Sequence, residues 1–462
     1  MWLFDFFKKV VKGLFSKDNV KDALNVDINI SNKMANAIKL WSKMYEGKPD
    51  WVKKDVYSLS LPCSIAAELA RLTTIEMKSE IVGSDRAEFM NEPYQNLMDN
   101  IRIHLEYALA KGSMAFKPFI SDGKIAIDCV QADMIYPIEF NSFGELISCI
   151  FVDRFTKNEK TYTRLEYHSF ENGKCTIINK AYMNEYGSDI LGSEIKLDTV
   201  SRWKDIEREI TINNLTKPLF SYFKVPMANT IESNSDIGVS VFSKAVDLIK
   251  KADEQYSRIV WEYKGSELAV DIDENCYKNN NNELPEYSDR LFRKLDIQGR
   301  TNDFYSVFSP AIRDSSLFNG LNKLLQRIEF ACGLAYGTLS DVQETAKTAT
   351  EIISSKQRSY ATVSDIQKSL KSTLENLIIS MDDLCSLYNL VGQGEYEVSF
   401  EFDDSLIVDS GADQAIMLQE VAAGIIKPEI YLMRRYGLTE EQCKDYMPSE
   451  KIKEEPDDID EE

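Results

Sequence analysis

Histidine is nearly absent from this chain of 462 residues, which contains only His104 and His168. Triads of the serine-hydrolase type need histidine as the base, and many zinc sites need it as a ligand. Two isolated histidines are more typical of surface or strand positions than of a metal site. We therefore expect that the protein is not an enzyme and that it has no catalytic residues, no metal ligands and no cofactor.

The cysteines form no C-x-x-C pair, which excludes the usual zinc-ribbon spacing. The eight cysteines lie far apart, at positions 63, 129, 149, 175, 276, 332, 385 and 443. Scattered cysteines of this kind are typical of reduced, mostly buried residues in a protein made in a reducing cytoplasm.

Long apolar runs are missing as well. The richest region, Leu317–Leu339, is interrupted by Lys323, Arg327 and Glu329, so no transmembrane helix is predicted. The first fifteen residues, MWLFDFFKKVVKGLF, place aromatic residues and lysines on different sides and do not resemble a secretory signal. They fit either a membrane-surface anchor or an arm that packs on the body or on a neighbouring subunit, and we favour the arm.

Phosphate-binding glycine motifs are also absent. There is no G-x-x-x-x-G-K-[ST] motif, and the only Gly-x-Gly, Gly392–Gly394, follows a helix and precedes a strand, which is the reverse of a dinucleotide loop. Acidic pairs such as Asp382-Asp383 and Asp403-Asp404 leave a metal-dependent nuclease open as an alternative. Pairs of this kind arise by chance in a chain with 75 acidic residues.

The net charge of −21 is the most informative bulk property. Proteins that grip nucleic acid neutralise phosphates with clustered lysine and arginine, so this chain should repel DNA on average. The tail Glu450–Glu462 holds eight acids and two lysines and is predicted to be disordered. The remaining excess of acids is spread through the body.

Hydrophobic spacing predicts helices from Asp18 to about Arg102 and on to Lys111, and then strands of period two. The predicted strands form one antiparallel meander that runs to about Met183, with turns at Ser121–Lys124 and Glu171–Lys174. Residues 185–236 look irregular and are predicted to be a folded loop.

Two helices with matching apolar seams follow, and they predict a helical hairpin. One seam runs through Phe242, Ala245, Ile249, Ala252, Tyr256, Ile259 and Tyr263, and the other through Leu317, Leu321, Leu324, Ile328, Ala331 and Ala335. Between the helices lies an insertion, Gly265–Arg313, with the asparagine-rich run Lys278–Asn282 and strand-like pieces ELAVDI and DFYSVF.

A small polar segment, Gly337–Glu351, precedes the longest helical pattern, from near Thr350 to near Leu390. A helix of that length spans roughly 60 Å and should need a large assembly or a coiled partner to cover it. The strand YEVSFEFDD follows. Short helices are predicted at Ala412–Gly424, Pro428–Tyr436 and Thr439–Tyr446.

The stretch Asn229–Ala269, with NSDIGVSVFSKAVDLIKKADEQYSRIVWEYKGSELA, and the stretch TAKTATE at Thr345–Glu351 closely resemble portal proteins of tailed phages that infect low-GC Gram-positive bacteria. The resemblance implies an α+β portal fold with a wing of helices and antiparallel sheet, a helical-hairpin stem, a small α/β clip, a long spanning helix and a helical crown. By resemblance, the parts are 1–238 wing, 239–263 stem helix, 264–313 clip, 314–336 stem helix, 337–349 tunnel loop, 350–410 long wing helix and returning strand, 411–450 crown, and 451–462 disordered acidic tail.

The resemblance implies a ring, usually a dodecamer, at one capsid vertex of the virion, assembled in the host cytoplasm. Double-stranded DNA would pass through this ring without sequence specificity during packaging and ejection. Implied partners are the terminase large subunit, the head-completion adaptor, and the major capsid and scaffolding proteins, with no stable membrane association. The acidity then suggests a channel wall that limits phosphate contacts and so lets DNA slide.

Two groups of site residues follow from the resemblance. The tunnel loop that faces DNA would include Gln343, Glu344, Thr345, Lys347 and Thr348. The clip surface that docks partners would include Asp271, Asp273, Glu274, Asn280 and Asn281. Two rival classes stay open: a metal-dependent nuclease of the packaging machinery, and a membrane-peripheral or capsid structural protein.

Overall fold

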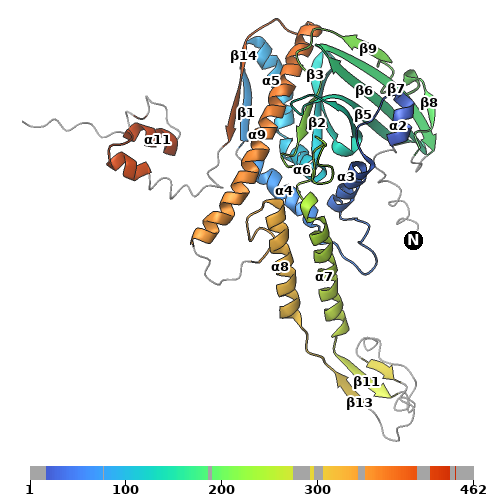
Figure 1. Ribbon diagram of the computed structural model, residues 1–462, viewed down its shortest axis with the longest axis vertical. Helices are drawn as coiled ribbons and strands as arrows, with labels where there is room; N and C mark the ends of the chain where they lie inside the picture. The colour runs from blue at the N-terminus through green and yellow to red at the C-terminus, as the bar shows by residue number, and fades with distance from the viewer. Residues whose placement is uncertain are drawn as a thin grey trace, which may run out of the picture. The chain divides into compact units, whose positions relative to one another are not determined.

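The computed structural model describes residues 17–75, 77–185, 190–273, 292–295, 305–341, 349–402, 417–436 and 443. The chain divides into two compact units, Met1–Phe402 and Asp403–Glu462. The N-terminal arm, the asparagine-rich run and the acidic tail are among the predicted features that lie outside the described residues. Helices and mainly antiparallel sheets make up the described part, so the predicted α+β class is confirmed (Figure 1).

Helices dominate the first hundred described residues, as predicted. They are α2 (Lys17–Leu24), α3 (Asn32–Tyr45), α4 (Leu61–Thr74), α5 (Asp85–Met98) and α6 (Ile101–Lys111). Ser31 begins α3 and Ser84 begins α5, and each side chain accepts a hydrogen bond from a first-turn amide, which stabilises the helix start. One prediction here is wrong, because strand β1 (Met77–Gly83) interrupts the helices and pairs with β14 (Tyr396–Phe402).

The predicted meander exists, but it is divided between two sheets. Strands β2 (Ser113–Ser121) and β3 (Lys124–Gln131) form a sheet with β10 (Ser221–Lys224). Strands β4 (Ile135–Phe140), β5 (Leu146–Lys157), β6 (Lys160–Glu171) and β7 (Lys174–Glu185) form another. The chain turns between the two sheets in a short 3-10 helix, Ala132–Met134. The divided meander allows apolar side chains of both sheets to face one core.

The segment predicted as irregular contains three short strands. They are β8 (Ser193–Ile195), β9 (Glu209–Ile212) and β10 (Ser221–Lys224). Both β8 and β9 extend the sheet of β7, and β10 pairs with β2. Runs of three or four residues are too short to show a period of two, so the sequence pattern missed them.

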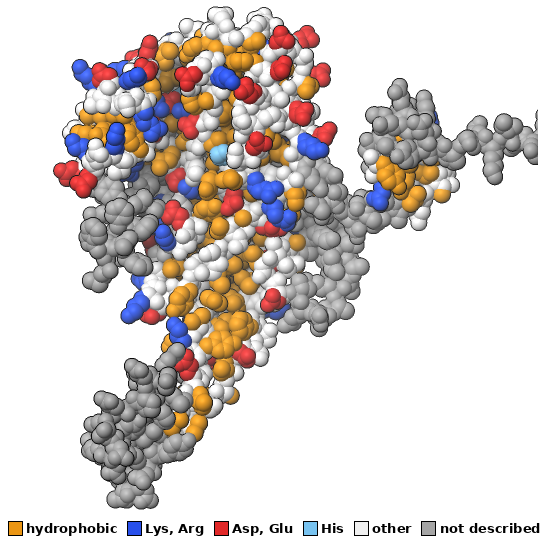
Figure 2. Space-filling view, turned by 180° about the vertical axis from the view of Figure 1, so that it is seen from behind, with side chains coloured by type: hydrophobic (Ala, Val, Ile, Leu, Met, Phe, Trp, Pro, Cys, Tyr) orange, Lys and Arg blue, Asp and Glu red, His pale blue; other side chains and the backbone are white. Residues whose placement is uncertain are grey.

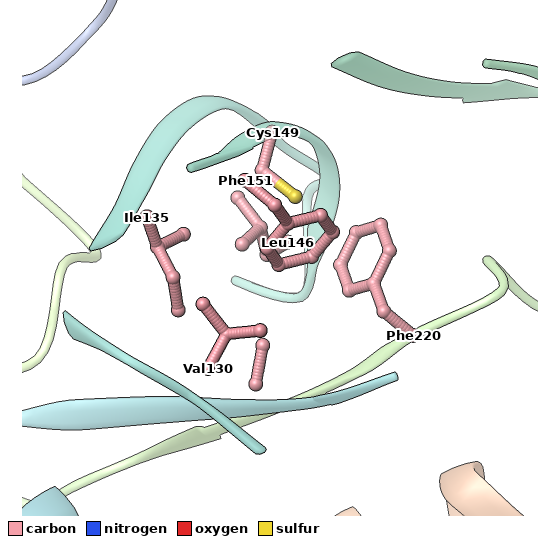
Figure 3. Packing of buried hydrophobic residues seen from close by; sticks show 7 residues of the cluster. Val130, Ile135, Leu146, Cys149, Phe151 and Phe220 are labelled. Atoms are coloured by element: carbon pink, nitrogen blue, oxygen red, sulfur yellow. The ribbon is translucent and has the colours of Figure 1, made fainter. Parts of the chain in front are cut away.

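The core between the sheets is apolar and rich in aromatic rings (Figure 3). Its buried members are Ala115, Val130, Ile135, Leu146, Cys149, Phe151 and Phe220. The rings of Phe151 and Phe220 meet edge to face, with centroids 5.4 Å apart, a favourable geometry for aromatic pairs. Residues from β2, β3, β4, β5 and the segment before β10 therefore close one cluster.

A buried charge network next to this core joins the two sheets. The Glu166 carboxylate of β6 lies 2.7 Å from Lys117 Nζ of β2 and 3.0 Å from Arg164, and it accepts a hydrogen bond from His168 Nε2 at 2.8 Å. Burial raises the pKa of Glu166, but Lys117, the His168 hydrogen bond and Arg164 outweigh burial, so the pKa lies well below its usual range. Burial lowers the pKa of His168. A neutral imidazole therefore faces an ionised carboxylate.

The predicted long helix is present as α9, Ala349–Leu387, whose 39 residues span about 58 Å. Its seam residues Val363, Ile366, Leu370, Leu374, Leu377, Met381 and Leu384 are buried, whereas Tyr388 lies beyond the helix end and is half exposed. The expectation that a large assembly or a coiled partner is needed to cover this helix is wrong for its described seam. Strands β2 and β10 and helices α4 and α5 of the same chain pack on α9.

Charge is mixed over the body, as expected for spread acidity. Figure 2 shows acidic and basic side chains interspersed on one face. Of the seven described cysteines, Cys149, Cys175, Cys332, Cys385 and Cys443 are buried, so the prediction that most cysteines are buried is confirmed for the described ones. None of the helices in the described ranges combines the length and apolar character that crossing a membrane requires.

The second unit contains short helices, as the sequence predicts. Residues 417–422 and α11 (Pro428–Tyr436) are helical. The first of these helices is predicted to begin at Ala412, and its predicted start lies outside the described residues. Most of the predicted third helix, Thr439–Tyr446, lies outside them as well.

Candidate functional site

The predicted hairpin is formed by α7 (Val246–Gly265) and α8 (Asp314–Cys332), which run side by side (Figure 1). Both helices are shorter than predicted, because a 3-10 helix, Ser243–Ala245, precedes α7 and Gly333 ends α8 in a left-handed conformation. The seams meet over most of their length, since Ile249, Ala252, Ile259, Leu321 and Ile328 are buried. The prediction is wrong for Tyr263, which is 42% exposed near the end of α7.

The insertion of the hairpin contains a small three-stranded sheet. Strand β11 (Ala269–Asp273) lies between β12 (Phe292–Leu295) and β13 (Tyr305–Phe308), parallel to the first and antiparallel to the second. The strand-like pieces ELAVDI and DFYSVF are thus confirmed as strands. At the base of this insertion, Arg313 and Glu262 form a two-bonded ion pair with distances of 3.0 and 2.9 Å.

Asp253 of α7 is buried and fixes the hairpin to the body. Trp51 Nε1 donates to its Oδ2 at 2.9 Å, and the Leu59 amide donates to its Oδ1 at 2.8 Å. One turn further along, Ser257 Oγ accepts from the Tyr57 amide at 2.9 Å. Burial raises the pKa of Asp253, and the bonds from Leu59 and Trp51 oppose that shift. The first half of α7 is therefore held against residues 51–59.

Replacing Asp253 with alanine is expected to lower the free energy of unfolding by about 2 kcal/mol, because two buried N–H groups lose their acceptor. Urea unfolding measures the change. Glu254→Ala is the matched control, since Glu254 forms an ion pair with Lys251 near the surface, and such a pair contributes about 0.5 kcal/mol or less. Equal shifts in the two variants would contradict the anchoring role of Asp253.

Glu329 of α8 is fully buried and holds the turn that follows the helix. Its Oε1 accepts hydrogen bonds from the amides of Gly337, Leu339 and Ser340 at 3.1, 2.6 and 2.8 Å, and its Oε2 accepts from Ser340 Oγ at 2.9 Å. We call these four residues the Glu329 clamp. Hydrogen bonds to a carboxylate are stronger than neutral ones, so the clamp fixes the chain just before residue 342.

Two further contacts support the clamp. Asn322 Oδ1 accepts from the Asp341 amide at 2.9 Å, and its Nδ2 donates to the Asp341 carbonyl at 3.1 Å. Gly333 has a φ of 72°, and a Cβ on this residue would lie 2.3 Å from Thr362 Oγ1 of α9. Only glycine suits both the conformation and the contact. The end of α8 therefore lies directly against α9.

The predicted site residues lie mostly outside the described residues. This holds for the whole tunnel-loop set: Gln343, Glu344, Thr345, Lys347 and Thr348. It also holds for Glu274, Asn280 and Asn281 of the predicted docking surface, whereas Asp271 and Asp273 lie on β11. Both sets stay predictions.

Sequence reasoning missed Glu329 and Asp253. Glu329 did carry a signal, because it is an acid between Ile328 and Phe330 in the most apolar stretch of the chain, and a buried acid needs partners. Asp253 carried none, since it lies among other charged residues. Within the described ranges, no group of three or more His, Cys, Asp or Glu side chains could hold a metal ion.

The described part of the chain is α+β, which is consistent with a portal fold. The sequence model of the family described as "Phage portal protein, SPP1 Gp6-like" matches residues 26–462. The chain belongs to this family, so the resemblance seen in the sequence is confirmed. No curated protein sequence matches the chain significantly.

Proposed function

We propose that this chain forms a ring at one capsid vertex and that double-stranded DNA passes through the ring during packaging and ejection. The same ring docks the terminase large subunit and later the head-completion adaptor, and the major capsid and scaffolding proteins surround it. The observation that carries the proposal is the family match over residues 26–462. The hairpin and its sheet support it, because paired helices can line a channel and a sheet beyond them can meet partners.

We also propose how the subunit is divided into parts, by its resemblance to portal proteins. We assign residues 1–238 and 350–410 to the wing, α7 and α8 to the stem, residues 264–313 to the clip, and residues 411–450 to the crown. Residues 337–349 form the tunnel loop, in which Lys347 lies near DNA. The Glu329 clamp supports this assignment, because it gives the loop a fixed starting point on the stem.

An exposed apolar surface on the hairpin supports assembly into a ring. Figure 2 shows hydrophobic side chains gathered on the hairpin. Large exposed members are Trp261 at 69%, Leu268 at 55%, Phe318 at 45%, Tyr263 at 42% and Ile312 at 40%. Monomeric proteins rarely expose apolar groups so densely unless a partner covers them. We assign this hairpin surface to contacts between neighbouring subunits. Such head-to-tail contacts close a ring when a whole number of equal rotations makes one full turn.

Negative-stain electron microscopy and mass photometry test the ring. The wild-type chain is expected to give rings with a central hole, and Trp261→Ser combined with Phe318→Ser is expected to lower the fraction in rings at least about tenfold, because each buried aromatic contributes about 1.5–3 kcal/mol. Phe143→Ser is the matched control. Phe143 is 90% exposed in the turn between β4 and β5, away from the hairpin.

Two outcomes would contradict the proposal in different ways. A wild-type chain that stays monomeric at high concentration would contradict the ring itself. Rings that form equally well with and without Trp261 and Phe318 would keep the ring and remove the hairpin surface from its interface.

A further inference from the structure

The two stem helices differ in the charge of the faces that they turn away from each other. On α7, exposed and partly exposed positions at helical spacing carry both signs: Asp247, Lys251, Glu254 and Arg258. Lys251 Nζ lies 2.8 Å from Glu254. The hydrogen bond from Lys251 and the nearby charges of Lys250 and Arg258 lower the pKa of Glu254. The cations of α7 therefore already have a carboxylate neighbour.

The corresponding face of α8 carries only positive charge. Its exposed positions recur at steps of three and four, opposite the buried residues of that helix: Ser316, Gly320, Lys323, Arg327 and Phe330. The acids of α8 are Asp314 in its first turn and the buried Glu329. No salt bridge joins Lys323 or Arg327 to a carboxylate of the residues that the structure describes. In a chain of net charge −21 this face is an exception.

A third cation continues this face toward α9. The Arg358 guanidinium lies over the Phe330 ring, 4.2 Å from its centroid, in a cation–π contact. Phe330 is the last exposed member of the α8 face, so Lys323, Arg327 and Arg358 form one basic track, which ends beside the Glu329 clamp. Four residues separate Lys323 from Arg327, a rise of about 6 Å along the helix.

We infer that this basic track of α8 contacts the phosphates of double-stranded DNA in the channel. The inference rests on the proposed function and names the stem residues that face the DNA. Two or three cations per subunit supply a weak, sequence-independent attraction, because each phosphate contact adds little affinity and is strongly screened by salt. The acidic surface elsewhere keeps the number of such contacts small. The basic track thus attracts the duplex weakly and still allows it to slide.

The wild-type lysines themselves can report the contact. Purified rings are mixed with a linear duplex that carries abasic sites, whose aldehydes form imines with nearby lysine Nζ atoms, and borohydride reduces these to stable links. Peptide mapping then gives the labelling of each lysine. Lys323 is expected to be labelled at least about fivefold more than Lys251 at about 50 mM salt, and the labelling should fall steeply as salt rises.

A pair of double variants gives an independent measurement on the same rings. Lys323→Gln with Arg327→Gln is expected to lower duplex retention about tenfold at low salt, since two phosphate contacts are lost per subunit engaged. Lys251→Gln with Arg258→Gln removes the same charge from α7 and is expected to change retention less than about twofold. Mass photometry checks that each variant forms rings.

The outcomes separate the inference from the function on which it rests. Rings in which Lys251 is labelled as strongly as Lys323, or in which the two double variants bind DNA equally, would overturn the inference and leave the portal function intact. A wild-type sample without rings would contradict the proposed function, and the inference would fall with it. Preferential labelling of Lys323 on intact rings, together with the retention difference, supports both.

Discussion

Glu329→Ala is expected to lower the free energy of unfolding by about 4 kcal/mol and to release the turn before residue 342. The substitution removes the acceptor of three amides and one hydroxyl, and each donor left without an acceptor costs about 1 kcal/mol at the lower end of the usual range. Hydrogen exchange reads the local effect. The amides of Gly337, Leu339 and Ser340 should exchange much faster in the variant than in the wild-type chain.

Two further variants sharpen this test. Glu329→Gln keeps the shape and one acceptor oxygen, so it should lose about half as much stability as alanine. Gln326→Ala, one turn earlier on α8, is the control, because Gln326 only accepts a bond from Lys323 at the surface. Unchanged protection of Gly337, Leu339 and Ser340 in Glu329→Ala would contradict the clamp, whatever the global stability.

Glu166→Ala is expected to destabilise the body by about 3–5 kcal/mol, because it removes the nearest carboxylate from the buried side chains of Lys117 and Arg164. Calorimetry or urea unfolding measures the loss. Glu171→Ala on the exposed end of the same strand is the matched control. A loss no larger than that of the control would show that the network contributes nothing to the pairing of the two sheets.

The same network predicts acid sensitivity. The folded-state pKa of Glu166 lies well below its usual value of 4.5, because Lys117, the His168 hydrogen bond and Arg164 outweigh the effect of burial. Its contribution is therefore complete above about pH 4.5 and is lost as the pH falls through the lower folded-state pKa. The lowered pKa of His168 acts in the same direction below pH 6.5. Glu166→Ala should show a flatter decline of stability between pH 6 and pH 3 than the wild-type chain.

Periodic apolar patterns predicted the longest elements well. The seam of α9 from Val363 to Leu384 is buried as expected, and β5, β6 and β7 match the period-two stretches. The buried side chains of such elements recur at regular positions, so apolar residues repeat at the same spacing in the sequence. The apolar pattern did not predict the division of strands β2 to β7 between two sheets, because pairing partners such as β10 come from distant parts of the chain.

Strand β1 shows why some elements escape the sequence. Only Ser79 and Ile81 of its seven residues are buried, so its face carries little pattern. Ser79 Oγ instead donates to the Ser399 carbonyl at 2.8 Å, a contact 320 residues away in sequence. Its structure is thus specified by a partner that no local window contains.

The candidate site was predictable only in outline. The two helical seams predicted the hairpin, because side chains that pack together must be apolar. The clamp was not predictable, since three of the donors to Glu329 are backbone amides, and amides occur at every residue except proline. Because Glu329 binds mainly backbone groups, the clamp needs no second side chain of a particular type, and the sequence therefore shows no motif for it.

The pairing of β1 with β14 also sets an order of events during synthesis. Every residue of β1, from Met77 to Gly83, pairs with a residue between Tyr396 and Phe402, so β1 stays without this partner until a segment some 320 residues later in the chain has been made. Strand edges left open for so long invite wrong pairings between nascent chains. The sheet of β1 and β14 therefore closes only after β14 has been made, and nascent chains that lie close together can exchange these strands until then.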